Sequence, residues 1–294
     1  MRILRATHLG MCFGVRDAIQ LARGRAAEGP VTILGELVHN EGVLEEMRER
    51  GVRMVGDVEE VTTASVLITA HGASNQRMAR VRARGHEVVE ATCPLVHHAH
   101  RSLQRLVDDG FHPVIIGRRG HVEVRGMTED LEVFDVVLSD ADVDAVEERR
   151  RFGVVAQTTQ RIGRARELVA RLRARFPDSE VRFIDTVCQP TKQRQDAAVE
   201  LARQCDVVIV IGGANSNNTA ELVRTCSRHC TSVHHVRGPG DLTWEWLRGA
   251  ETVGITAGTS TPDNQIDAVE DRLGELGRLV EQASWPSRRR MIPA

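Results

Sequence analysis

The chain has 294 residues, and its 39 basic and 41 acidic side chains give a formal net charge of -2 at pH 7. This near-neutral balance and an aromatic content of only 3% offer neither the basic surface nor the stacking platforms of nucleic-acid-binding proteins. The sequence contains no apolar stretch near the ~18 residues that cross a membrane, and no leader-like segment at its start. We therefore expect a cytoplasmic protein with neither a nucleic-acid nor a membrane partner.

Short apolar runs rich in β-branched residues alternate with longer stretches of helical spacing along the chain. The runs predict nine strands, in chain order at 2–6, 31–35, 65–70, 87–91, 113–117, 152–157, 181–185, 206–212 and 252–258. Helical patterns lie between them, for example at 14–26, 41–51, 166–176 and 261–277. Alternation of this kind favours an α/β fold with mainly parallel sheets.

One cysteine in each third of the chain follows a predicted strand, namely Cys12, Cys93 and Cys188. Small polar turns follow most of the other strands, and open α/β sheets bind ligands at the carboxyl ends of their strands. We therefore expect three pseudo-symmetric α/β units around a shared centre. The predicted units comprise residues 13–93, residues 94–185, and residues 186–280 together with 1–12, and a C-terminal tail follows at 281–294.

Three cysteines brought to one centre in a reducing compartment indicate an iron-sulfur or a zinc site. A structural zinc site and an electron-transfer cluster each take four protein ligands, whereas a catalytic metal keeps one position open. Cys12, Cys93 and Cys188 therefore favour a central [4Fe-4S] cluster with one iron open to substrate. The other cysteines are expected to be structural, since Cys205 opens a strand, and Cys226 and Cys230 share one helix face.

The polar turns supply groups that could act on a substrate at this centre. Glu123 follows a predicted strand, and burial there could keep its carboxyl group protonated as a proton donor. His39, His71 and His121 would surround the same centre, and the turns at 212–218 and 257–261 resemble phosphate-binding helix N-termini. Taken singly, such residues are also typical of ordinary helix caps and solvated side chains. Their recurrence in a threefold order favours the functional interpretation.

These motifs together resemble the LytB/IspH family of 4-hydroxy-3-methylbut-2-enyl diphosphate reductases, which catalyse the last step of the non-mevalonate isoprenoid pathway. The resemblance spans almost the whole chain and is carried by MCFGVRDAI, VHNEGVLEEMRERG, TAHGAS, EATCPLV, GHVEV, QTT, VCQPTKQRQ, NSNNT and ITAGTSTPD. It implies a [4Fe-4S] cluster on Cys12, Cys93 and Cys188. It also implies proton delivery by Glu123 with Thr158 and His121, and a diphosphate held by His39, His71, His121, Ser216, Asn217, Asn218 and Ser260.

The activity that the resemblance implies is reductive dehydroxylation of an allylic diphosphate to isopentenyl and dimethylallyl diphosphates. An external donor such as ferredoxin or flavodoxin would supply the electrons, because the chain has no nucleotide or flavin fingerprint. The sequence departs from the family pattern at Val122, Arg125, Ala214, Asn217 and Glu221. Three alternatives therefore stay open: a paralogue with another substrate, a non-redox lyase of the quinolinate synthase type, and a non-catalytic cluster-binding sensor.

Overall fold

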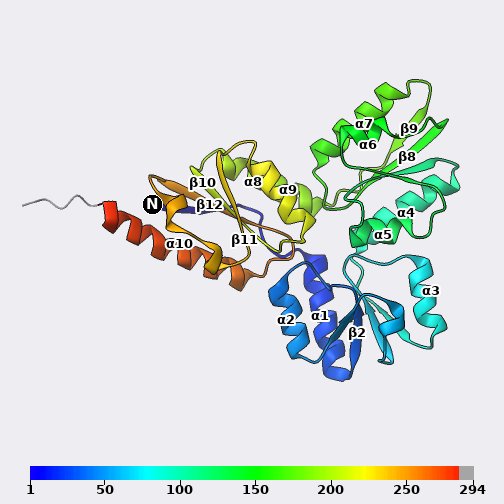
Figure 1. The fold of residues 1–294 in the computed structure, drawn as a ribbon, viewed down its shortest axis with the longest axis horizontal. Coiled ribbons are helices and arrows are strands. Elements are labelled where there is room, and N and C mark those ends of the chain that lie inside the picture. Colours follow the sequence, from blue (N-terminus) through cyan, green and yellow to red (C-terminus); the bar gives the residue numbers. More distant parts are fainter. Residues whose placement is uncertain (285–294) are drawn as a thin grey trace, which may run out of the picture.

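The computed structural model describes residues 1–284 and forms three lobes that meet at a common centre (Figure 1). Each lobe contains a sheet of four strands, and every strand pairing within the three sheets is parallel. The predicted α/β fold with parallel sheets in three similar units is therefore confirmed. The proposed boundaries between the units stay a prediction.

The first sheet has the strand order β3-β2-β4-β5. Its strands are β2 (Val31–Leu34), β3 (Arg53–Val55), β4 (Ser65–Ile68) and β5 (Glu87–Glu90). The helices of this unit are α1 (Phe13–Glu28), α2 (Glu41–Glu49) and α3 (Asn75–Ala83), with a short 3₁₀ turn at Val58–Glu60.

The second sheet has the equivalent order β7-β6-β8-β9. Its strands are β6 (His112–Ile116), β7 (Asp135–Val137), β8 (Arg151–Ala156) and β9 (Glu180–Phe183). The helices are α4 (Pro94–Asp108), α5 (Val122–Thr128), α6 (Asp140–Asp144) and α7 (Ile162–Arg175).

The third sheet has the order β1-β12-β10-β11, so the first strand of the chain completes the last unit. Its strands are β1 (Arg2–Arg5), β10 (Val207–Ile211), β11 (Ser232–Val236) and β12 (Thr252–Ala257). The helices are α8 (Gln189–Ala202), α9 (Asn217–Cys226) and α10 (Asp263–Ser284), with 3₁₀ turns at Pro239–Asp241 and Trp244–Leu247. Because α10 continues to Ser284, residues 281–284 of the predicted tail are helical, and residues 285–294 lie outside the described residues.

The nine predicted strands all form, to within a residue or two at their ends, but three further strands were not predicted. These are β3, β7 and β11, and each occupies the same edge position in its sheet. β3 and β7 have only three residues each, and two histidines interrupt the apolar pattern of β11, so none of them has the continuous apolar run of a central strand such as β10, which is buried along its whole length. The three omissions are therefore one feature repeated by the pseudo-symmetry.

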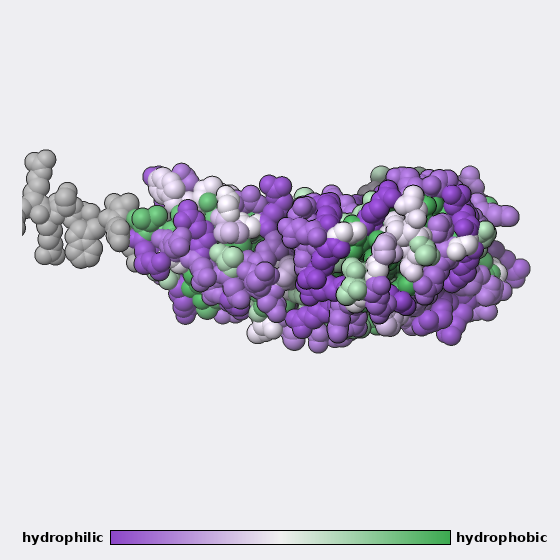
Figure 2. Space-filling view, turned by 90° about the horizontal axis from the view of Figure 1, so that it is seen from below, coloured by the Kyte–Doolittle hydropathy of each residue, from purple (hydrophilic) through white to green (hydrophobic). Residues whose placement is uncertain are grey.

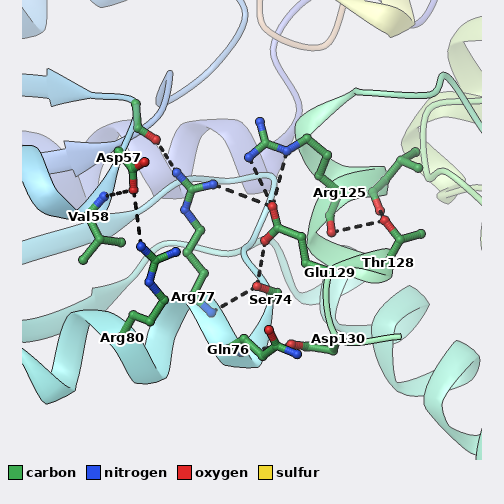
Figure 3. A network of polar contacts seen from close by, with 12 residues as sticks. Asp57, Val58, Ser74, Gln76, Arg77, Arg80, Arg125, Thr128, Glu129 and Asp130 are labelled. Atoms are coloured by element: carbon green, nitrogen blue, oxygen red, sulfur yellow. Dashed lines mark hydrogen bonds and ion pairs between the residues drawn. The ribbon is translucent and has the colours of Figure 1, made fainter. Parts of the chain in front are cut away.

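The first two units are joined by a polar network between α3 and α5 (Figure 3). Ser74 donates to Glu129 at 2.8 Å, and two backbone N–H groups at the start of α3 donate to the Asp130 carboxylate at 2.7 and 2.9 Å. Glu129 also pairs with Arg125 at 3.1 Å and lies 3.8 Å from Arg77. These contacts hold the N-terminus of α3 against the second unit, and so fix the two units relative to each other.

The surface of the molecule is mainly hydrophilic on the face shown in Figure 2, where apolar groups form only small separate patches. No helix among residues 1–284 is both long enough and apolar enough to cross a membrane.

Candidate functional site

Cys12, Cys93 and Cys188 occupy equivalent places in the three units, each between a strand and a helix. They follow β1, β5 and β9 and are the N-cap residues of α1, α4 and α8, respectively. The unsatisfied N–H groups of a helix N-terminus carry partial positive charge, which favours a thiolate over a thiol. The pseudo-symmetric fold thus places three potential thiolates where three helix N-termini begin.

The environment of Cys93 and Cys188 disfavours ionisation without a cation. Burial raises the pKa of Cys93, and it raises the pKa of Cys188 to about 11 despite a 3.0 Å contact with the Thr191 hydroxyl. The negative charges of Cys12 and Glu123 raise both pKa values further. Thiols of this kind ionise readily when a metal binds them, because metal coordination stabilises the thiolate.

The side chain of Cys93 packs closely against the first turn of α1. A Cβ atom at Gly14, in the first turn of α1, would overlap the Sγ atom of Cys93 and approach its Cβ to 3.0 Å. Within residues 1–284, no three His, Cys, Asp or Glu side chains are placed so that they could share one metal ion. A four-iron cluster binds its thiolates to different irons, so its ligands need not meet at one ion.

The other three cysteines lie in the packed interior of the third unit. Cys226 is fully buried and Cys230 is 8% exposed, and both belong to the core cluster formed with α8 and β10. Cys205 packs against the same cluster. The expectation that Cys226 and Cys230 share a helix face is wrong, because α9 ends at Cys226 and Cys230 follows it in a loop.

His39, His71 and His121 come together at the place where the three units meet. The rings of His39 and His71 are stacked with centroids 4.3 Å apart, and the His121 ring lies 5.1 Å from His39 and 5.7 Å from His71. Burial lowers the pKa of His121 to about 3 and the pKa of His71 well below its usual value. In the absence of a bound anion, His71 and His121 are therefore neutral at physiological pH.

The contacts of the histidines assign their tautomers. His121 is the N-cap of α5, and its Nδ1 accepts from the backbone N–H of Glu123 at 3.1 Å, so its proton resides on Nε2. That atom lies 3.3 Å from Nε2 of His39, whose Nδ1 donates to Glu36 at 2.9 Å. The hydrogen bond from His39 holds the pKa of Glu36 below its usual value. Glu36 was not predicted from the sequence, although its position three residues before His39 is a detectable signal.

Glu123 is the buried carboxyl group of the site, with only 1% of its surface exposed. It lies in the first turn of α5, directly after the loop that follows β6. Its Oε1 accepts from the backbone N–H of Thr158 at 2.7 Å, and its Oε2 accepts from the Thr158 hydroxyl at 3.0 Å. Burial raises the pKa of Glu123 to about 7, against the opposing effect of these two hydrogen bonds. The carbonyl of Thr158 in turn accepts from the backbone N–H of Cys188. Thr158 is therefore hydrogen-bonded both to the acid Glu123 and to Cys188.

The turns predicted to bind phosphate also reach this centre. Ser216 caps α9, and Asn217 donates to the carbonyl and hydroxyl of Thr159 at 3.2 and 3.1 Å. Asn218 accepts from the backbone of Thr259 at 3.0 Å, and Ser260 donates to the carbonyl of His39 at 3.0 Å. The bonds of Asn217 link the third unit to the second, and the bond of Ser260 links it to the first.

A small cavity of about 30 Å³ lies between these groups. It is lined by Val15, Val38, His39, His71, His121, Glu123, Thr159, Ser216, Asn217, Asn218, Thr259 and Ser260. Two buried atoms of this lining, Nδ2 of Asn218 and Nδ1 of His71, have no hydrogen-bond partner. Buried polar atoms without a partner are rare, so the pair points to a polar ligand. This volume holds about one water molecule, and a larger ligand therefore requires the surrounding groups to move apart.

The cavity adjoins an open groove of about 340 Å³, since His39 and His121 line both. Arg77, Arg118 and Arg125 line this groove together with Glu36 and Glu129, and Glu129 pairs with Arg125 and lies near Arg77. The side chain of Glu221, although buried on α9, is neutralised by an ion pair with Arg224.

Comparisons with known proteins agree with this architecture. The family model described as LytB protein matches residues 3–274. The 4-hydroxy-3-methylbut-2-enyl diphosphate reductase of Pelobacter propionicus is 36% identical over 281 residues, which cover 95% of this chain and 99% of that protein. The protein of the same name from Geobacter sp. (strain M21) is 38% identical over 282 residues, with 95% and 99% coverage.

Two solved structures are similar along nearly the whole chain. The E-1-hydroxy-2-methyl-but-2-enyl-4-diphosphate reductase of Plasmodium falciparum superposes with a TM-score of 0.87 at 25% identity, covering 92% of this chain and 87% of that one. A structure of (E)-4-hydroxy-3-methyl-but-2-enyl diphosphate reductase, described as the terminal enzyme of the non-mevalonate pathway, has a TM-score of 0.66 at 34% identity, with 94% and 100% coverage. Sequence and fold thus agree, and the chain belongs to the LytB protein family.

Proposed function

We propose that this protein reduces 4-hydroxy-3-methylbut-2-enyl diphosphate to isopentenyl and dimethylallyl diphosphates. The reaction adds two electrons and two protons, breaks the allylic C–O bond and releases water. The observation that carries the proposal is the buried acid Glu123, which lines the same cavity as the three histidines and is bonded to the residue that supports Cys188. The activity named for the relatives and the family membership support the same assignment.

Cys12, Cys93 and Cys188 would hold a [4Fe-4S] cluster. The donor set fits, because three partly buried thiols lie at three helix N-termini, and burial raises the pKa of Cys93 and of Cys188, so that binding of a metal would ionise them. Bound in this way, the cluster would supply electrons and a Lewis-acidic iron that has no protein ligand.

The diphosphate would bind where the third unit meets the histidines. Asn218 and His71 offer buried atoms without a partner, and Ser216 places the positive end of α9 at the same cavity. Asn217, Ser260, His39 and His121 complete the lining. No Lys or Arg side chain lines the cavity, so neutral donors, the helix N-terminus and protonation of the histidines would balance the charge of the ligand.

Glu123 would deliver the proton to the departing hydroxyl group. With a pKa of about 7, it is close to half protonated at neutral pH, which suits a general acid. The two hydrogen bonds from Thr158 fix the orientation of the carboxyl group. The ring of His121, the N-cap residue of α5, accepts a hydrogen bond from the backbone N–H of Glu123 at Nδ1. It would donate a hydrogen bond to the ligand from Nε2.

A ferredoxin- or flavodoxin-type protein would donate the electrons, since the chain has no flavin or nucleotide fingerprint of its own. The departures from the family pattern leave room for a different anion as substrate. Ala214 and Arg125 line grooves beside the cavity, whereas Asn217 lines the cavity itself. These residues therefore make a paralogue the second candidate.

Anaerobic purification, iron and sulfide analysis, and an assay with the hydroxylated diphosphate and a reduced low-potential dye test the proposal. We expect iron-dependent turnover that stops when the reductant is left out, because a lyase would continue without it. A loaded protein that does not turn over this substrate would refute the assignment. If turnover then appears in the variant carrying both Asn217→Ser and Ala214→Lys, the protein is a paralogue with another substrate.

The diphosphate site has its own test. Alanine at Ser216, Asn218 or Ser260 removes one donor to a charged oxygen, and such a bond contributes roughly 1.5 to 3 kcal/mol. We expect binding of inorganic diphosphate to weaken about ten- to hundredfold for each variant, measured by calorimetry. No binding by the wild type at millimolar concentration would contradict the site and leave the cluster proposal standing.

A further inference from the structure

Arg194 is a buried arginine of α8 that has no acidic partner. Only 7% of its surface is exposed, and no ion pair to a carboxylate is formed by its guanidinium group within residues 1–284. The neighbouring Lys192 on the same helix differs, because its ammonium group pairs with Asp185 at 2.9 Å. A buried cation that lacks a counter-ion is costly, so its charge requires an explanation.

The hydrogen bonds of Arg194 connect the loop of Cys12 to the N-terminal turn of α8, which begins directly after Cys188. Its Nε and Nη2 donate to the carbonyl of Gly10 at 2.9 and 2.6 Å, and its Nη1 donates to the carbonyl of Pro190 at 2.9 Å. Gly10 precedes Cys12 by two residues, and Pro190 follows Cys188 by two. The Pro190 contact lies within α8, so the guanidinium group ties the loop of Cys12 to the first turn of the helix that Cys188 caps.

The negative charges nearest to Arg194 are the same two cysteines. Burial lowers the pKa of the Arg194 guanidinium, and the thiolates of Cys12 and Cys188 oppose this change, whereas Arg16 adds to it. A cluster on three thiolates carries net negative charge, and its reduction adds more. A fixed cation that is shielded from water favours the reduced form, because low polarity strengthens the attraction.

We propose that Arg194 is a positioning residue of the cluster site, which clamps the loop of Cys12 to the first turn of α8, directly after Cys188, and provides the buried positive charge that makes the cluster easier to reduce. The inference rests on the proposed function, since it requires a cluster on these cysteines. It assigns two separable roles to one side chain, a geometric role and an electrostatic role.

Three variants separate these roles. Arg194→Gln removes the charge, Arg194→Lys keeps the charge but loses the two-nitrogen grip on Gly10, and Arg16→Gln is the matched control. Arg16 also lies on the first turns of a helix that begins at a cluster cysteine, but its side chain is 58% exposed and faces Asp263 at 3.6 Å. Water and salt screen an exposed charge, so its removal should have little effect.

The measurement is an anaerobic reductive titration of the loaded proteins, followed by the spectrum of the reduced cluster, together with iron and sulfide content. At a fixed potential, we expect Arg194→Gln to raise the ratio of oxidised to reduced cluster about tenfold. For a one-electron couple this corresponds to a reduction potential that is lower by about 59 mV. Arg194→Lys should retain most of the wild-type ratio while losing iron faster to a chelator. Arg16→Gln should change the ratio by less than about twofold.

The outcomes distinguish this inference from the proposed function. A wild-type protein that binds no iron after reconstitution refutes the function and the inference with it. If the wild type loads and turns over, but Arg194→Gln titrates as the wild type does, the electrostatic role is refuted alone. If Arg194→Gln binds no cluster, the test passes to Arg194→Lys. Cluster binding by Arg194→Lys supports the need for a positive charge. If Arg194→Lys also binds no cluster although its circular-dichroism spectrum is intact, the electrostatic role is refuted.

Discussion

Replacement of Glu123 by glutamine tests the acid of the site with minimal change in shape. Glutamine keeps an oxygen that can accept from the N–H of Thr158, and the Thr158 hydroxyl can rotate to accept from the new amide group. The variant cannot donate a proton from a carboxyl group. Because general acid catalysis typically contributes roughly 10² to 10⁴ in rate, we expect turnover to fall by about that range with cluster content unchanged.

The pH dependence follows from the pKa of Glu123. Burial raises it from the ordinary value of 4.5 to about 7, so the acid loses its proton as the pH rises through 7. The wild-type rate should therefore fall above pH 7, by about tenfold for each further unit. The residual rate of Glu123→Gln should be flat over the same range, because no carboxyl group titrates.

The same shift predicts a difference in stability. A carboxyl group whose pKa is raised in the folded state is fully stabilising below its unfolded value of 4.5, and this stability is lost as the pH rises through 7. One pKa unit corresponds to about 1.4 kcal/mol, so ionisation of Glu123 costs the folded protein about 3 kcal/mol. Glu123→Gln avoids this cost, and its melting temperature should exceed that of the wild type by several degrees at pH 8 but not at pH 4.5.

Steady-state assays from pH 6 to 9 and anaerobic thermal unfolding at pH 4.5 and 8 check both effects. The reasoning fails if the variant retains more than half of the wild-type rate, since Glu123 would then not supply the proton. It also fails if the two proteins have the same difference in melting temperature at both pH values, because the buried carboxyl group would then not be the titrating group.

Three further predictions address the supports of the site. Gly14→Ala should prevent stable cluster binding, because its methyl group would overlap Cys93. Gly24→Ala on the same helix meets nothing within 4 Å, so this control should bind the cluster normally and be more stable by about 0.5 to 1 kcal/mol. Iron analysis and melting curves compare the two variants. Thr158→Val removes one hydrogen bond that lowers the pKa of Glu123, so the alkaline limb of the rate profile should move to higher pH, while Thr158→Ser should leave it in place. Serine at Cys12, Cys93 or Cys188 should abolish a four-iron cluster, whereas serine at Cys205, Cys226 or Cys230 should leave the iron content unchanged, and equal loss from the second group would contradict the threefold argument.

The fold was largely predictable because the signal for buried parallel strands is strong. Runs such as 206–212 are apolar on both faces, and each is followed by a helix with its own period, so strand and helix reinforce each other. β3 and β7 are too short to carry such a run, and His234 and His235 interrupt the one in β11. Their pairing depends on neighbours that are distant in sequence, which a local pattern does not contain.

The residues proposed to act on a ligand were easier to predict from the sequence than the residues that hold them in place. Cys12, His121 and Glu123 stand at the ends of strands, and strand ends can be identified from local patterns. Arg194 resembles the many arginines on exposed helix faces, and only the fold shows that its guanidinium group is buried and bonded to the loop of Cys12 and to the first turn of α8. A buried charge without a counter-ion is a property of three-dimensional position, so structure is needed to find it.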